Sequence, residues 1–189
     1  VKDLGGAAGG QSDVLKVSSG AIANAVDIKN FVATSDTENL GAATLTTVAT
    51  GGGIINMSGA TGSAQYTIIG GAGADTLTGD GGNDTFKIAA STQGNSDTID
   101  GKGGDDTLDV STGTHVLTNN NNLKDIENIT LNNSTINLTN QVEGFKITGG
   151  SGTDSITGGS GADTIIVSAA GEANSDTING GGGTNKIEV

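Results

Sequence analysis

The fold of this chain is decided by the stretch Gly70-Gly71-Ala72-Gly73-Ala74-Asp75-Thr76-Leu77-Thr78, which has the form Gly-Gly-x-Gly-x-Asp-x-apolar-x. A second nonapeptide of this kind follows directly over residues 79–87, and the tandem recurs 79 residues later over 149–157 and 158–166. The glycines allow a tight turn, and the residues after the aspartate can form a short strand. Nine residues therefore make half a coil, and consecutive turns fall on opposite sides of a stacked structure.

The composition also favours a stacked structure over a globular domain. Of 189 residues, 34 are glycine and only four are aromatic, which leaves little material for a compact core. In a solenoid, each coil adds one or two apolar side chains to a narrow core and packs only on its neighbours. We therefore predict an all-β solenoid.

The charge balance excludes some partners and requires others. The chain has 21 acidic residues against eight basic ones, all of them lysine, for a formal net charge of -13. Proteins that bind nucleic acid need basic side chains for the phosphates, so this class is excluded. The chain also has no cysteine and no apolar run near the ~20 residues of a membrane span. Cations are the partner that clustered carboxylates require.

The duplication extends beyond the nonapeptides. The sequence Asn95-Ser96-Asp97-Thr98-Ile99 recurs as Asn174-Ser175-Asp176-Thr177-Ile178, and a nine-residue step then leads to Asp106 in one copy and to Asn185 in the other. A partial third copy at residues 14–20 and a chain end in the same phase predict a segment of a longer array. We divide the chain into the end of a preceding module at 1–20, linker coils at 21–69 and 111–148, and two nonapeptide modules at 70–110 and 149–189.

The linkers are expected to be further coils of the solenoid. Their apolar residues alternate at period two, as at Ile129 and Leu131, which is typical of short strands. Weak helical signals occur only at 21–30 and 122–127. His115 is the only histidine, and we expect it at the surface because no second histidine could join it in a metal site.

The motif aspartates are the candidate metal ligands. Calcium takes ~6–8 oxygen ligands at ~2.3–2.6 Å, and one glycine turn with one carboxylate supplies only part of that shell. Turns on the same side of the solenoid are two repeats apart, at a strand spacing of about 4.8 Å, so a neighbouring turn can complete it. We predict one ion within each of four pairs: Asp75 with Asp97, Asp84 with Asp106, Asp154 with Asp176, and Asp163 with Asn185. The last site should be the weakest because Asn185 carries no charge, and Asp100 is a candidate additional ligand.

The eighth position of each repeat is apolar and should point into the core. It is occupied by Leu77, Phe86, Ile99, Leu108, Ile156, Ile165, Ile178 and Ile187. Metal and core are then coupled, because aspartates that are not neutralised would hold neighbouring turns apart. Removing calcium should loosen at least residues 70–110 and 149–189.

The tandem nonapeptides resemble the RTX calcium-binding repeats, and the Thr/Asn-rich strands between them look like those of a bacterial surface-layer protein. The resemblance implies a right-handed parallel β-helix or β-roll with calcium in the turns. It also implies that backbone carbonyls near the start of each motif join the aspartates as ligands, here those of Gly70, Ala72, Gly79, Gly81, Gly149, Ser151, Gly158 and Ser160. In that family the protein leaves the cell by type I secretion and folds outside, where calcium is abundant.

The resemblance leaves two roles open. The first is a structural segment of a surface-layer or adhesin-like protein at the bacterial cell surface, with copies of the parent protein as partners and a cell-surface polysaccharide as a further candidate. The second is an accessory module of a type I-secreted enzyme, which would need a catalytic domain elsewhere. The chain itself is not expected to be an enzyme, because it lacks His-Glu-x-x-His and Gly-x-Ser-x-Gly motifs. A flexible glycine linker is disfavoured by the fixed nine-residue step.

Overall fold

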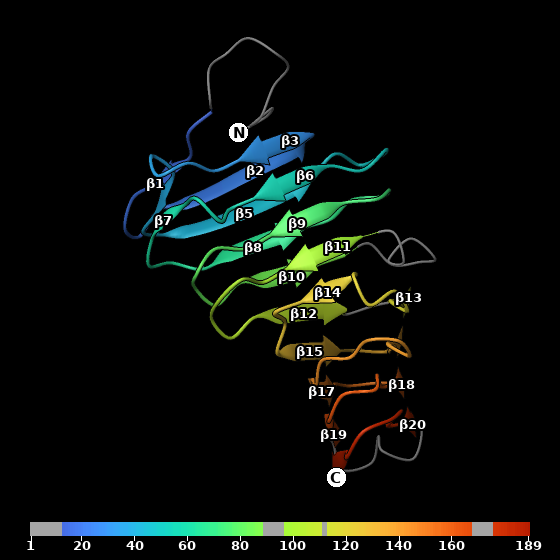
Figure 1. Cartoon of the computed structure of the whole chain (residues 1–189). Helices are drawn as coiled ribbons and strands as arrows, with labels where there is room; N and C mark the ends of the chain where they lie inside the picture. The colour runs from blue at the N-terminus through green and yellow to red at the C-terminus, as the bar shows by residue number, and fades with distance from the viewer. Residues whose placement is uncertain (1–12, 89–96, 111–112, 168–175) are drawn as a thin grey trace.

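The computed structural model describes residues 13–88, 97–110, 113–167 and 176–189. These residues form 21 strands and no helix, and every strand pairing among them is parallel. Successive coils stack on one another from the N-terminal to the C-terminal end (Figure 1). The prediction of an all-β parallel solenoid is confirmed. Among the described residues, no helix is present that could cross a membrane.

One sheet of nine strands runs the length of the stack. In spatial order its members are β2 (Ile22–Ile28), β5 (Ala42–Thr47), β8 (Tyr66–Ile69), β10 (Thr85–Lys87), β12 (Thr107–Val110), β15 (Asn128–Leu131), β17 (Lys146–Gly149), β19 (Thr164–Val167) and β21 (Lys186–Glu188). The linker coils and both modules contribute to this sheet, so the linkers are part of the solenoid.

The remaining strands form three shorter sheets. The five-stranded sheet contains β14 (Leu123–Lys124), β11 (Thr98–Asp100), β9 (Thr76–Thr78), β6 (Ile54–Asn56) and β3 (Asn30–Val32). The four-stranded sheet contains β13 (Gly113–Val116), β16 (Ser134–Asn137), β18 (Ser155–Thr157) and β20 (Thr177–Asn179). The three-stranded sheet contains β1 (Lys16–Val17), β4 (Glu38–Asn39) and β7 (Thr61–Gly62).

The nine-residue step produces the expected half-coils. The chain passes from β8 in the nine-stranded sheet to β9 in the five-stranded sheet and back to β10. Residues at the same motif position then pair in register, as Leu77 does with Ile99 and Phe86 with Leu108. The second module repeats this alternation between β18 and β19, with Ile156 paired to Ile178.

The eighth motif position forms the core in most coils. Leu77, Phe86, Ile99, Leu108, Ile156 and Ile165 are each at most 1% exposed. Ile178 is partly buried against this core, whereas Ile187 is 52% exposed, so the prediction for Ile187 is wrong. The reason is its place on β21, which pairs with β19 on one side and lies at the edge of the nine-stranded sheet.

Three expectations from local sequence are corrected by long-range pairing. The helical signal at 21–30 is wrong, because these residues form β2 and the start of β3, with a positive φ at Asp27. The signal at 122–127 is also wrong, because β14 and a turn with positive φ at Asp125 occupy it. His115 is buried instead of exposed, since it pairs with Ile136 in the ladder that continues to Ile156.

The coils approach so closely that one glycine is required for steric reasons. A Cβ atom at Gly161 would lie within 3.0 Å of the backbone of Glu143 and Gly144 in the preceding coil, whereas a Cβ at Gly81 would meet open space. We expect Gly161→Ala to lower the free energy of unfolding by ~1–3 kcal/mol. Gly81→Ala should leave it unchanged or raise it by up to ~1 kcal/mol, because alanine restricts the unfolded chain. Urea unfolding in saturating calcium compares the two, and equal losses would contradict this account of the packing.

Candidate metal centre

The motif aspartates lie on the inner side of the turns, and each is the last residue before a strand. Six of them are at most 2% exposed: Asp75, Asp84, Asp97, Asp106, Asp154 and Asp163. Asp176 and Asn185, in the last two turns, are half-buried. Carboxylates are seldom buried to this extent without a partner, so the turns must offer them stabilising contacts.

One oxygen of each aspartate ties two coils together. The Oδ1 atom accepts a hydrogen bond, 2.6 to 2.9 Å long, from a backbone N–H of the preceding coil. The donor and acceptor residues are Gly53 and Asp75, Asp75 and Asp97, Tyr66 and Asp84, Asp84 and Asp106, Ser134 and Asp154, Asp154 and Asp176, and Phe145 and Asp163. We call this series the carboxylate ladder. The predicted neighbours are therefore adjacent, and in the fourth pair Asp163 donates to Asn185 at 2.9 Å.

The second oxygen, Oδ2, turns back toward the first glycine of its own motif. A Cβ at Gly158 would lie 2.6 Å from Asp163 Oδ2 and 2.5 Å from the carbonyl oxygen of Gly180 in the next coil. Gly79 is placed in the same way against Asp84 Oδ2 and the Gly101 carbonyl. Carboxylate and carbonyl oxygens from two coils thus converge beside the first glycine, where any larger residue would displace them.

Burial makes the charged form of these carboxylates unfavourable and so raises their pKa values. It raises the pKa of Asp84 and of Asp97 to about 6, against the lowering effect of their backbone hydrogen bonds. Burial also raises the pKa of Asp106 to about 7, and the Asp84, Glu127 and Asp80 carboxylates raise it further. The pKa values of Asp75 and Asp163 are raised for the same primary reason.

Four lysines of the described residues form ion pairs: Lys87, Lys102, Lys124 and Lys186. Their ion pairs are with Asp109, Asp100, Asp125 and Glu188, which lie on the outer faces of the strands and turns. None of these pairs reaches Asp84, Asp97 or Asp106. These three buried carboxylates therefore have no lysine partner among the described residues.

Asn185 stands where the other motifs have an aspartate, so its turn shows the same position with a neutral amide side chain. Its Oδ1 takes the ladder position, and its Nδ2 donates at 2.8 Å to the carbonyls of Gly180 and Gly182. In this turn a hydrogen-bond donor lies among the carbonyls where the other turns have Oδ2. The carbonyls at the first and third motif positions of this turn therefore accept hydrogen bonds from an amide group.

The residues present fit calcium. The donors are hard oxygens of carboxylates and carbonyls, which suit calcium and not softer metals. Asp106 Oδ2 is buried and accepts no hydrogen bond, so one ligand oxygen is left without a protein donor. In the part of the chain that the structure describes, no group of three or more acidic, histidine or cysteine side chains has the geometry of a metal site. Most of the shell would have to come from backbone carbonyls, as the predicted set of Gly70, Ala72, Gly79, Gly81, Gly149, Ser151, Gly158 and Ser160 assumes.

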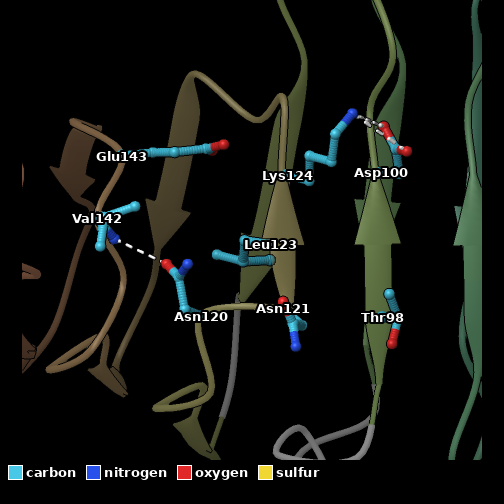
Figure 2. Close-up of a pocket in the computed structure, with 8 residues that line it drawn as sticks. All are labelled: Thr98, Asp100, Asn120, Asn121, Leu123, Lys124, Val142 and Glu143. Atoms are coloured by element: carbon cyan, nitrogen blue, oxygen red, sulfur yellow. Dashed lines mark hydrogen bonds and ion pairs between the residues drawn. The ribbon is translucent and has the colours of Figure 1, made fainter.

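Asp100 is not brought to the buried aspartates. It lies on the outer face of β11, where Lys102 and Lys124 pair with it at 2.9 and 3.3 Å. Burial would raise its pKa, but the two lysines hold the pKa below its usual value. Figure 2 shows Lys124 reaching toward Asp100 beside a surface pocket of about 420 Å³, which Glu143 also lines.

The sequence reading missed two participants in the turns. Glu127 Oε2 accepts a hydrogen bond from Asp106 N at 2.8 Å and so extends the carboxylate ladder by one coil. Thr47 Oγ1 accepts one from Gly71 N at 2.7 Å. A signal existed for Glu127: it is an acidic residue just before a strand, one residue short of the 22-residue step that separates Asp84 from Asp106. The divergent stretches 89–96 and 168–175 and residues 1–12 lie outside the described residues.

Comparison with known families agrees with this geometry. The family model of the RTX calcium-binding nonapeptide repeat (4 copies) matches residues 67–86, 92–114 and 148–187. The matched segments include every aspartate of the four predicted pairs. No curated protein and no solved structure gave a significant match to the chain. The chain therefore carries RTX calcium-binding nonapeptide repeats, folded as a parallel β-solenoid of the β-roll kind.

Proposed function

We propose that this chain is a structural solenoid that requires calcium to fold, in a secreted protein of the bacterial cell surface. The observation that carries the proposal is the burial of the Asp84, Asp97 and Asp106 carboxylates, to which none of the lysine ion pairs of the described residues extends. Bound calcium would supply the missing positive charge. The side chains that would hold it are those of the four predicted pairs, with the carbonyls of the first and third motif positions beside them.

The proposed site of action is outside the cell. RTX repeats are typical of secreted proteins. Extracellular calcium modules commonly bind at ~10⁻⁴–10⁻³ M, so such sites would stay empty in the cytosol and fill at millimolar calcium outside. A chain held open by its own carboxylates until export would remain suited to secretion in an unfolded state.

A surface-layer role is favoured over catalysis by the uniformity of the stack. Repeats and linker coils share one nine-stranded sheet, and the motif aspartates of the described turns are engaged in hydrogen bonds between coils. The second candidate is an accessory module of a type I-secreted enzyme or adhesin, which the nonapeptides alone favour equally. Electron microscopy of the parent protein separates them: calcium-dependent two-dimensional arrays support the surface-layer role, and isolated particles contradict it.

Calcium binding can be tested by terbium luminescence, because Tyr66 is the only tyrosine and the chain has no tryptophan. Tyr66 N donates to Asp84 Oδ1 at 2.8 Å, so the tyrosine adjoins a predicted site. Terbium added to the ion-free protein should emit on excitation of Tyr66, and excess calcium should abolish the emission. Asp84→Asn should weaken it strongly.

The second module provides the matched control. Phe145 occupies the place of Tyr66, and its N–H donates to Asp163 at 2.9 Å. Asp163→Asn should therefore leave the Tyr66-sensitised emission in place, while Phe145→Tyr should add emission that Asp163→Asn removes. An absence of emission, or emission that calcium does not displace, would contradict calcium binding in these turns.

A further inference from the structure

The coil that follows the first module ends in an unusually short turn. Between β11 and β12 the chain uses the six residues 101–106, whereas between β14 and β15 it uses only the three residues 125–127. The flanking strands are nevertheless in register, with Asp100 opposite Lys124 and Thr107 opposite Asn128. The short turn therefore stacks directly on the glycine-rich one.

Glu127 takes the place that a motif aspartate holds in the other coils. Asp84 N donates to Asp106 Oδ1 at 2.6 Å, and one coil later Asp106 N donates to Glu127 Oε2 at 2.8 Å. The additional methylene group of glutamate lets the carboxylate reach back from a turn that is three residues shorter. The carboxylate ladder therefore continues into a coil that lacks the nonapeptide.

Oxygen atoms from both turns meet beside Gly101. A Cβ atom on Gly101 would lie within 3.0 Å of the Asp125 carbonyl oxygen and of Asp106 Oδ2. The positive φ of Asp125 belongs to the left-handed region, in which the turn brings this carbonyl over the glycine. Asp106 is fully buried, and its Oδ2, which points into this space, accepts no hydrogen bond.

The charges around this space are uncompensated. Asp80, Asp84 and Glu127 all act on Asp106 as neighbouring carboxylates. Lys102, in the turn 101–106, pairs with Asp100, and Lys124, at the end of β14, pairs with Asp100 and Asp125. An anionic pocket with an unpartnered buried oxygen is an arrangement that a hard cation stabilises.

We propose that the turns 101–106 and 125–127 hold a further calcium ion, with Asp106 Oδ2, the Asp125 carbonyl and the Glu127 carboxylate as its ligands from this chain. The site rests on the proposed calcium function and extends it beyond residue 114, where the repeat match of the first module ends. It would give the linker coil a calcium dependence of its own. Water would complete the shell, as is common for calcium.

Glu127→Gln isolates the charge of this site. The glutamine amide oxygen can still accept the Asp106 N–H, so the ladder bond is kept while the anion is lost. Glu38→Gln is the matched control, because Glu38 lies in β4, in the three-stranded sheet, and the charge change is the same. Isothermal titration with calcium should give one bound ion fewer for Glu127→Gln than for the wild-type chain, and the wild-type number for Glu38→Gln.

The outcomes separate this inference from the proposed function. Calcium binding by the wild-type chain with an unchanged number and affinity of sites in Glu127→Gln would overturn the inference and leave the proposed function standing. A wild-type chain that binds no calcium would overturn both. Anomalous diffraction from a crystal of the calcium-loaded wild-type chain tests the site without a substitution. A calcium peak between Asp106 and Asp125 supports the site, and peaks confined to the other turns refute it.

Discussion

In excess chelator at pH 7.5, the chain is expected to lose most of its strand structure. The buried carboxylates of one ladder repeat at the spacing of neighbouring strands. The Asp84 N–H donates to the Asp106 carboxylate, and the Asp106 N–H donates to the Glu127 carboxylate. Without a cation these charges repel one another inside a structure that excludes water, so either the coils separate or the carboxylates take up protons. At pH 7.5 proton binding is insufficient, and separation of the coils is expected.

The free energy of calcium binding is large enough to determine whether the chain is folded. A site with a dissociation constant of ~10⁻⁴–10⁻³ M at millimolar calcium contributes roughly 0.4–1.4 kcal/mol to folding. Four such sites contribute roughly 2–6 kcal/mol, which is comparable to the whole stability of many domains, ~5–15 kcal/mol. Far-UV circular dichroism during calcium titration should therefore show a cooperative gain of strand signal.

Acid should partly replace calcium in the same experiment. In the ion-free fold the pKa values of Asp84 and Asp97 are raised to about 6 and that of Asp106 to about 7, above the ~3.9 of an unfolded chain. A raised folded pKa means that protons bind the fold more tightly, so their stabilisation is complete below about pH 4 and disappears as the pH rises through 6 to 7. The chelated chain should keep more strand signal at pH 5 than at pH 7.5. An unchanged spectrum and melting temperature in chelator at pH 7.5 would contradict the proposed coupling.

The second large effect is expected from Ile165→Ala. Ile165 is fully buried on β19 between Ile147 and Ile187, and its truncation leaves a cavity in the core. Such substitutions cost ~2–5 kcal/mol, because packing is lost on both sides of the cavity. The free energy of unfolding from urea titration in saturating calcium measures the loss.

Ile187→Ala provides an internal control with the same chemistry. Ile187 has the same motif position in the adjacent coil but is 52% exposed, so roughly 1 kcal/mol or less is expected. Equal losses for the two variants would show that exposure at the edge strand does not govern the contribution of this ladder, contrary to the structure.

The regular parts of the fold follow from the sequence because they are local. Glycines, an aspartate and one apolar residue at fixed phases specify a turn and a strand within nine residues, and the coils with this pattern stack as expected. The burial of His115 was not predicted, because a polar residue in a core ladder is recognised only when its neighbours in the stack, Ile136 and Ile156, are known. The exposure of Ile187 was not predicted either, because the motif position is the same as in the buried coils but the strand lies at the edge of the sheet.

The candidate site divides in a similar way. Pattern alone identified Asp75, Asp97 and their counterparts as neighbours, since equal spacing implies equal height in the stack. It did not identify Glu127, because the length of the intervening turn changes which acidic side chain reaches the ladder. Nor could it show that the Asn185 amide nitrogen would donate to the carbonyls of Gly180 and Gly182 in its own turn.

The carboxylate ladder has a polarity with a consequence for assembly. In each of its bonds the acceptor side chain belongs to the later coil and the N–H to the earlier one, as in Gly53 to Asp75 and Asp75 to Asp97. Each bond needs both coils, so the two faces of a coil differ: the face toward the following coil offers N–H donors, and the face toward the preceding coil offers carboxylate oxygens. A coil can therefore join the stack in one orientation only.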